Sequence, residues 1–365
     1  MKNDDLLKDS VQLTGLGMCG SRIALEFQKL GYRTTYYNSD IVDVRGSGIN
    51  EKDLLLVSGT GSGGSPLKGR EILDDHMTEF KKFLLSKMEE GKMQIFLAGL
   101  GGGTGGSSII PAVEIARESG HKVGVLVTLP PKMLGMLAMD NAMKTLKQLR
   151  ECGAHMFVLA DNEYLINKVG LSEDWWKKIN EYIVIRLVSV LGLLREGKIS
   201  QTGIGSIDKA EILRIIQYGN GLTDIRDMYF TAKEVDSLSE EDLKTKLFNS
   251  CFIEGFNYKD TLAYLVSIDL PTTGVFTKFS SKVFDITKQT CGSAISRLGM
   301  FVDPLLNNAI RVTMVNSGLK LPRVLKSKIN NLKRDSVRHH MKKTKEDNFD
   351  FSDVDDISLD EDFEI

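Results

Sequence analysis

The sequence predicts an α/β protein: an N-terminal Rossmann-like domain on a parallel sheet, a long central helix and a smaller α+β domain with a mixed sheet. Three observations lead to this prediction. Short apolar runs alternate with helix-like stretches up to residue 161, three of these runs end in glycine-rich loops, and the pattern changes after a long apolar helix. Alternating strands and helices form right-handed units whose parallel strands share one carboxyl edge.

Six apolar runs in the first half have the length and composition of buried strands. They are 11–15, 34–38, 54–59, 93–99, 122–129 and 155–161. The stretches near 20–30, 67–90, 108–119 and 133–151 have helical patterns. In the third of these helices we expect Ser107 or Ser108 as the cap and Pro111 in the first turn.

A long helix follows, from Ser172 to Gly197, and its apolar residues recur nearly all round, which favours burial between two domains. Beyond it we expect strands at 261–270, 282–288 and 309–318, and helices near 208–219 and 238–254. The expected division of the chain is a first domain over 1–172, the central helix over 173–197, a second domain over 198–322, a basic helix over 323–347 and an acidic, disordered tail over 348–365.

The composition is that of an ordinary globular protein, and a formal net charge of −2 gives no general case for nucleic-acid or membrane binding. The four cysteines form no CxxC pair, so we expect no zinc site and no disulfide framework; they are Cys19, Cys152, Cys251 and Cys291. The first ten residues are too polar for a signal peptide, and no apolar run has the length of a membrane span. We therefore expect a cytoplasmic protein with no membrane partner.

Three glycine-rich loops each follow an expected strand, and each fits the spacing GxGxxG. They read GLGMCGSR (15–22), GTGSGGSP (59–66) and GGGTGGSS (101–108). The backbone N–H groups of such a loop and the positive end of the following helix form an anion site. One match is weak evidence, but three at one sheet edge can surround a single polyphosphate.

The first loop also allows a different interpretation. Gly15, Gly17 and Gly20, with Asp40 about 20 residues further on, fit the fingerprint of a dinucleotide-binding domain. That interpretation makes the protein an NAD-dependent oxidoreductase, although the other two loops do not belong to the motif and the five histidines form no obvious catalytic set. A P-loop is excluded because GxxxxGK[ST] does not occur. A third interpretation is a nucleotide-binding scaffold without turnover.

Together the three loops resemble those of the tubulin/FtsZ superfamily. GGGTGGSS resembles the family's signature loop, GLGMCGSRIALEF its first nucleotide loop, NSD (38–40) the end of its second strand and GTGSGGSPLKGR its third loop. These motifs occur in the family's order and spacing, and the resemblance covers about 10–322. It implies a GTPase that binds GTP or GDP, with Mg²⁺ held mainly by the nucleotide phosphates and no metal ligand assigned to a side chain.

The resemblance also implies which residues contact the nucleotide. Asn162 follows the sixth strand, where the family has an asparagine that contacts guanine. Trp176 and Asn180 share one helix face and correspond to the base-stacking and base-edge residues, although packing between domains is the alternative for Trp176. In the fifth loop this sequence has Leu134 and Ala138 where FtsZ has a Glu and an Arg that reach the ribose. The remaining positions implied are Gly17, Met18, Cys19, Gly20, Ser21, Asp40, Gly61, Gly63, Gly64, Gly102, Gly103, Thr104, Gly105 and Gly106.

Asp208 and Glu211 are the candidate catalytic carboxylates. Family members complete the site with acidic residues from the next subunit, and GIGSIDKAEIL (203–213) follows the central helix as that family loop does. The two carboxylates would orient and polarise the attacking water, so that hydrolysis requires head-to-tail assembly into a filament. An acid followed three residues later by Glu is also an ordinary capping pattern at a helix start.

The C-terminal segment has a strong charge asymmetry. Residues 320–345 hold ten Lys or Arg and one acid, whereas residues 349–365 hold eight acids and no base. Charge runs are commonly solvated faces and tails. The divergent body with this tail nevertheless resembles the TubZ family, the plasmid- or phage-encoded segregation tubulins of bacilli and clostridia. That resemblance implies dynamic filaments that segregate DNA, with the tail contacting a DNA-binding adaptor protein on a centromere-like DNA site.

Overall fold

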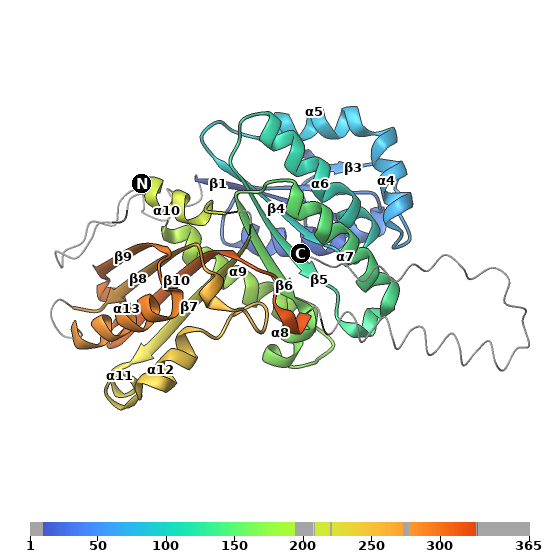
Figure 1. Ribbon diagram of the computed structural model, residues 1–365. Coiled ribbons are helices and arrows are strands. Elements are labelled where there is room, and N and C mark those ends of the chain that lie inside the picture. The colour runs from blue at the N-terminus through green and yellow to red at the C-terminus, as the bar shows by residue number, and fades with distance from the viewer. Residues whose placement is uncertain are drawn as a thin grey trace, which may run out of the picture.

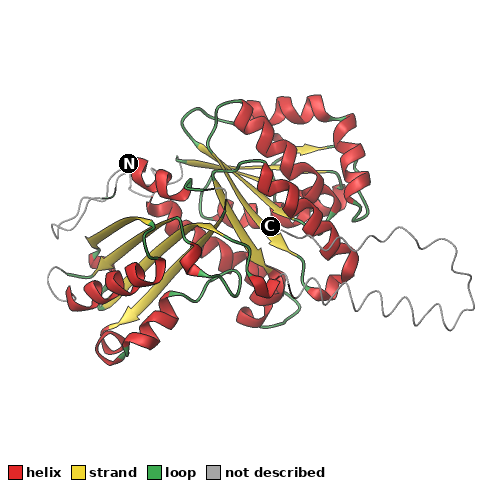
Figure 2. Ribbon diagram, viewed as in Figure 1, coloured by secondary structure: helices red, strands yellow, loops and turns green. Residues whose placement is uncertain are grey.

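The computed structural model describes residues 10–193, 207, 209–219, 221–272, 277–325 and 327. These residues form two domains, one on a six-stranded sheet and one on a four-stranded sheet, with a long helix between them (Figure 1). Figure 2 shows helices packed around both sheets, which is the layered arrangement that buries the apolar faces of a sheet. The predicted fold class is confirmed.

The larger sheet is parallel in all its pairings and has the strand order β3-β2-β1-β4-β5-β6. Its central strands are buried on both faces, as their nearly continuous apolar sequences require. All six predicted strands form, although the third ends at Leu56 rather than at residue 59. The strands are β1 (Val11–Leu16), β2 (Thr34–Asn38), β3 (Leu54–Leu56), β4 (Met93–Gly99), β5 (Val123–Leu129) and β6 (Met156–Asp161).

Helices cover both faces of this sheet. One face packs against α2 (Gly17–Lys29), α8 (Asn162–Val169) and α9 (Trp175–Leu193), and the other against α4 (Pro66–Asp75), α5 (Met77–Lys87), α6 (Gly103–Glu118) and α7 (Gly135–Glu151). The expected helix over 67–90 is therefore two helices. The remaining elements are α3 (Ile41–Val44) and the 3₁₀ turns Glu51–Asp53 and Lys132–Leu134.

The central helix α9 lies between the domains, as its all-round apolar pattern predicts. It contacts α2 and α8 of the first domain and β7 of the second. Ile183, Leu187 and Val190 have no exposed surface and belong to a core shared by the two domains.

The second domain is built on a mixed sheet of order β7-β10-β8-β9, in which only β8 and β9 are parallel. Its strands are β7 (Leu222–Thr231), β8 (Ala263–Leu270), β9 (Ile295–Val302) and β10 (Ala309–Leu319). One face packs on α10 (Lys209–Ile216), and the other on α11 (Ala232–Ser237), α12 (Glu240–Leu247) and α13 (Thr277–Cys291). Two 3₁₀ turns, Tyr258–Asp260 and Pro304–Leu306, complete it.

The predicted strand at 282–288 is wrong, because these residues lie inside α13. Phe279, Val283 and Ile286 recur at helical spacing and pack together on the second sheet. A short apolar run fits a strand and a helix equally well, and here the packing against the sheet decides. Strands β7 and β9 and helix α8 were not predicted.

Several predicted features fall outside the described residues. Asp208 is one of them, and so is the acidic tail over 348–365; of the expected basic helix, only 323–325 and 327 are described. No helix within the described ranges has both the length and the apolar character needed to cross a bilayer.

Candidate functional site

A cavity of about 350 Å³ opens at the carboxyl edge of the larger sheet. The loops after β1, β3 and β4 all contribute to it, together with residues that follow β2, β5 and β6. Every described residue that lines it precedes residue 163. The predicted convergence of three glycine loops on one site therefore occurs. The lining residues predicted from the sequence are Gly17, Met18, Cys19, Asp40, Gly61, Gly63, Gly64, Gly102, Gly103, Thr104, Gly105 and Asn162.

Hydroxyl groups around Thr104 join the third glycine loop to the second glycine loop and to the end of β2. Its Oγ1 lies 2.6 Å from Ser39 Oγ and 3.4 Å from Ser62 Oγ, both at hydrogen-bonding distance. A main-chain bond also joins the second glycine loop to the segment after β2, since the Gly61 N–H donates to the Ser39 carbonyl at 2.8 Å. The walls of the cavity are thus fixed by contacts among the loops themselves.

Close backbone approach explains the glycines of this site. A Cβ on Gly103 would lie 2.1 Å from Ser62 Oγ, and Gly17 has a φ of +66° with its Cβ position 2.8 Å from the Gly105 nitrogen. By contrast, no heavy atom lies within 4 Å of the Cβ position of Gly63, Gly64 or Gly102. Steric contact excludes a side chain at the first two positions. The other three leave open space beside the cavity, and at Gly63 and Gly64 the positive φ of +57° and +76° favours glycine.

Two helices begin at the cavity without a side-chain cap. Helix α2 begins at Gly17 and α6 at Gly103, and neither N-cap residue accepts a bond from the first turn. The unbonded N–H groups and the positive helix ends therefore favour an anion between them. The expected cap at Ser107 or Ser108 is wrong, because the glycines themselves form the first turn and Pro111 lies inside the helix.

The charged side chains lining the cavity are two carboxylates, Asp40 and Asp43. Asp40 caps α3 by accepting from the Val42 N–H at 2.8 Å. Burial raises the pKa of Asp43 and the negative charge of Asp40 adds to this, while the amide of Asn38 and the positive charge of Arg22 oppose it. Since no described Lys or Arg lines the cavity, a bound polyphosphate would draw on main-chain N–H groups and a metal ion for compensation.

Asn162 carries a buried polar atom that the protein leaves unbonded. The residue opens α8 directly after β6 and lines the cavity. Its Oδ1 is inaccessible to solvent and has no hydrogen-bond partner among the described residues. Buried acceptors are nearly always satisfied, so this oxygen points to a ligand that donates to it.

Five of the predicted binding residues lie outside this cavity. A Cβ at Gly20 would lie 1.9 Å from the Leu97 carbonyl oxygen, so this glycine permits α2 to pack on β4. Gly106 lies behind the cavity at a groove between α4, α6 and α7. Ser21 and Trp176 line a neighbouring cavity of about 730 Å³ that shares Met18 and Asp43 with the first. Asn180 is buried on α9.

Trp176 is about one-third exposed, and the guanidinium carbon of Arg22 lies 4.3 Å from the centroid of its ring. This stack sets the tryptophan beside α2 rather than in the interdomain core. Trp175, by contrast, packs against that core.

Glu211 lies in the first turn of α10, on the second domain (Figure 1). Its Oε1 accepts from Arg297 Nε of β9 at 2.6 Å in a partly exposed ion pair. Its predicted companion Asp208 lies outside the described residues. Since no described residue of the second domain lines the cavity, the fold of one chain keeps Glu211 apart from it.

Sequence reasoning missed several residues of the site. Asp43 comes three residues after Asp40, and that spacing after a strand was a usable signal. Thr128 lies near the end of β5 and Pro130 follows the strand, at the same sheet edge as the glycine loops. Ser39 and Ser62 lie in motifs that the sequence pointed to, but their hydroxyl contacts could not be predicted because they form only once the loops meet.

Comparison with known proteins shows which proteins this chain is similar to. Residues 10–170 match the model of the tubulin/FtsZ family, GTPase domain. The chain is 25% identical over 324 residues to cell division protein FtsZ 1 of Methanocaldococcus jannaschii, across 86% of this chain and 84% of that protein. It is 26% identical over 191 residues to tubulin-like protein TubZ of Bacillus cereus, across 46% of this chain and 44% of that protein.

The fold is also similar to that of a GTPγS-form protofilament of TubZ from Bacillus thuringiensis serovar israelensis. The TM-score is 0.78 at 15% identity, over 93% of this chain and 94% of that chain. At this level of identity the likeness concerns the fold.

Proposed function

Because residues 10–170 match the model of the tubulin/FtsZ family, GTPase domain, we propose that this protein is a GTPase that assembles head to tail into filaments. The proposal rests on one observation: three glycine loops and two helix N-termini without a side-chain cap meet at the same cavity. The carboxylates Asp208 and Glu211 of one subunit complete the site of the next.

The residues of the cavity fit a nucleoside triphosphate with Mg²⁺. The first-turn N–H groups of α2 and α6 bind the phosphates, and the open spaces at Gly63, Gly64 and Gly102 admit them without a side-chain clash. Mg²⁺ would be held mainly by phosphate oxygens and water, and Asp40 and Asp43, the carboxylates that line the cavity, would be available for its outer contacts. The metal supplies charge compensation that the cavity otherwise lacks.

The base is held at the α8 and α9 end. The unbonded Oδ1 of Asn162 accepts from a donor of guanine. Trp176 lines the neighbouring cavity, and in this proposal the base extends into that cavity and stacks on the ring. Asn180 lies one turn further along α9 and contacts the base edge, which requires this buried side chain to become accessible.

Exposed apolar side chains beside the cavity support assembly. Leu134 lines the cavity and is 59% exposed. Leu67 and Leu137 are more exposed than Leu134, and Met133 is nearly as exposed. Met133, Leu134 and Leu137 lie within five residues of one another, and a group of exposed apolar side chains of this kind favours an interaction site. In FtsZ the fifth loop reaches the ribose, whereas here Leu134 presents an apolar contact to a neighbour. A head-to-tail contact repeats without closing and gives a filament.

The test is phosphate release from GTP measured against protein concentration, with light scattering alongside. We expect a threshold below which both vanish, because a single chain does not bring Glu211 to the cavity. Above it the rate should rise linearly. A rate per molecule that is independent of concentration would mean that one chain contains the whole site.

A matched variant for this experiment is Gly102→Ala. The added Cβ meets no protein atom and φ stays in the ordinary region, so the unfolding temperature should stay that of wild type. GTP binding should nevertheless weaken, since the methyl group projects beside the phosphate position. An unchanged GTP affinity would mean that the phosphates do not bind beside the start of α6.

We further propose that the filaments segregate plasmid or phage DNA through the C-terminal segment. The support is the similarity to TubZ together with the basic segment and acidic tail. The tail then binds an adaptor protein on a centromere-like DNA site, and the basic residues reach phosphate in a salt-dependent manner.

Removing residues 348–365 should leave filament formation and GTP turnover intact and abolish binding to the adaptor–DNA complex. Sedimentation of labelled adaptor–DNA with filaments measures this, at two salt concentrations. Co-sedimentation that equals the full-length protein would exclude the tail as the contact.

The strand order of the larger sheet also fits the alternative of an NAD-dependent oxidoreductase. The order β3-β2-β1-β4-β5-β6 is also that of dinucleotide-binding domains. Competition between GTP and NAD for the cavity distinguishes the two, and displacement of labelled GTP by NAD at equal concentration would favour the oxidoreductase.

A further inference from the structure

Helix α8 connects the cavity to the second domain. Its first residue, Asn162, lines the cavity, and the preceding Asp161 N–H donates to the Phe252 carbonyl of the second domain at 2.9 Å. The position of the Asn162 side chain therefore depends on where the second domain holds the start of this helix.

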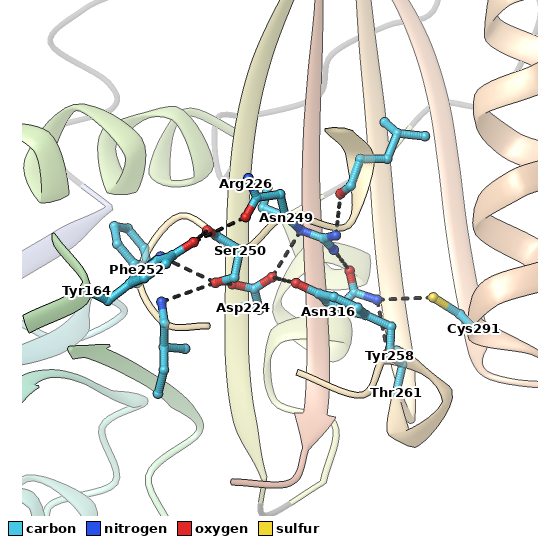
Figure 3. Close-up of polar contacts among 12 residues, drawn as sticks. Tyr164, Asp224, Arg226, Asn249, Ser250, Phe252, Tyr258, Thr261, Cys291 and Asn316 are labelled. Carbon is cyan, nitrogen blue, oxygen red and sulfur yellow. Dashed lines mark hydrogen bonds and ion pairs between the residues drawn. The ribbon is translucent and has the colours of Figure 1, made fainter. Parts of the chain in front are cut away.

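Two side chains on α8 donate hydrogen bonds to the same carbonyl of the second domain. Tyr164 Oη donates to the Ser250 carbonyl at 2.9 Å and to Asn249 Oδ1 at 3.1 Å, and Lys168 Nζ donates to the same Ser250 carbonyl at 3.0 Å. The ammonium of Lys168 also lies 4.5 Å from the Tyr164 ring centroid. Figure 3 shows Tyr164 reaching the 249–252 segment from the first domain.

Ser250 also forms a hydrogen bond to a buried ion pair. Its hydroxyl donates to Asp224 Oδ1 at 2.6 Å, while Asp224 Oδ2 accepts from Tyr258 Oη at 2.8 Å and lies 3.0 Å from Arg226 Nε. Arg226 has no exposed surface and also donates to Asn316 of β10 (Figure 3). A fully buried charge pair has few alternative arrangements, so Ser250 is held in one place.

We infer that Tyr164 and Lys168 are positioning residues that couple nucleotide contact at Asn162 to the buried Asp224–Arg226 pair through Ser250. The inference rests on the proposed function and names the regulation of that same site. A ligand that bonds Asn162 fixes the start of α8, and α8 in turn fixes the 249–252 segment. Coupling of this kind is reciprocal, so loosening the second-domain contact must weaken nucleotide binding.

The experiment uses the full chain below its assembly threshold. GDP affinity is measured with a fluorescent GDP analogue, and hydrogen exchange is followed at the amides of Phe252 and Ile253, whose nitrogens lie 3.3 and 3.4 Å from Ser250 Oγ. In wild type, saturating GDP should slow exchange at these amides. Tyr164→Phe keeps the ring and removes the hydroxyl.

Tyr164→Phe should lower GDP affinity by about fivefold, the worth of one hydrogen bond. It should also abolish the GDP-dependent slowing of exchange even when GDP saturates the protein, which a merely structural role would leave in place. Lys168→Met should act in the same direction. Tyr229→Phe is the matched control, because Tyr229 lies on β7 and is half-exposed, and both readouts should stay at wild-type values.

The outcomes separate the two hypotheses. If wild type binds GDP and Tyr164→Phe keeps both the affinity and the protection, the coupling is overturned and the proposed function stands. If wild type does not bind GDP, the proposed function falls, and the inference falls with it.

Discussion

Replacing Glu211 by alanine should lower GTP turnover by at least about 100-fold, the usual contribution of a positioned acid or base. GTP binding and filament formation should persist, because no described residue of the second domain lines the cavity. The physical reason for the expected loss of turnover is that the glycine loops, which we propose bind phosphate, contain no group that activates water. Phosphate release and light scattering on the same samples measure the two properties separately.

Capping is the competing role for Glu211, and the chain offers a matched control. Glu234 completes a capping box with Thr231 at the start of α11 on the same domain. Glu234→Ala should cost about 1 kcal/mol of stability and leave turnover unchanged. If Glu211→Ala behaves in the same way, with turnover intact and only stability reduced, then Glu211 is a cap and the catalytic hypothesis is lost.

The ion pair with Arg297 bears on the same experiment. Arg297 Nε lies 2.6 Å from Glu211 Oε1 across α10 and β9, so alanine also frees an arginine. Glu211→Gln retains a hydrogen-bond acceptor for Arg297 while removing the charge. It should keep wild-type stability and share the loss of turnover, which assigns the effect to the carboxylate and not to the disturbed arginine.

Replacing Arg226 by alanine should destabilise the protein by about 3–5 kcal/mol, the range for removing one partner of a buried pair. The alanine leaves the Asp224 carboxylate uncompensated in a site that is 1% exposed. It also removes the guanidinium that lies 4.5 Å from the Tyr258 ring centroid and 5.0 Å from that of Phe248. Chemical denaturation followed by circular dichroism measures the change in the free energy of unfolding.

A surface ion pair gives the matched control. Arg70 pairs with Asp74 on α4 at 2.9 Å, and both side chains are about half-exposed. Arg70→Ala should cost about 0.5 kcal/mol or less, because water and salt screen an exposed pair. Removing both buried charges, as Asp224→Asn with Arg226→Met, should recover part of the loss. An Arg226→Ala protein within 1 kcal/mol of wild type would mean that water reaches Asp224.

Among the predicted site residues, the glycines were the most reliable. Gly17 has a positive φ and Gly103 has no room for a Cβ, and both requirements are local properties that leave a glycine in the sequence. Asn162, which the resemblance to the family singled out, also lines the cavity. The roles of these residues in nucleotide binding stay predictions until the experiments above are done.

The errors have a common origin in longer-range packing. Residues 282–288 look like a strand in isolation, yet they form a helix because Val283 and Ile286 share a face against the second sheet. Helix α6 begins at Gly103 rather than at a serine, because the glycine turn fits against the second glycine loop, 59–66. Neither of these packing contacts can be predicted from the sequence alone.

The sequence by itself therefore determined the alternating architecture of the first domain and the three loops that meet at its carboxyl edge, because apolar periodicity and glycine sterics are local. Only the tertiary structure decided which residues share a charge or a bond across the chain. Arg226 meets Asn316, 90 residues away, and Tyr164 meets Ser250. Burial sets the strength of such contacts, and burial belongs to the folded chain rather than to any short segment of it.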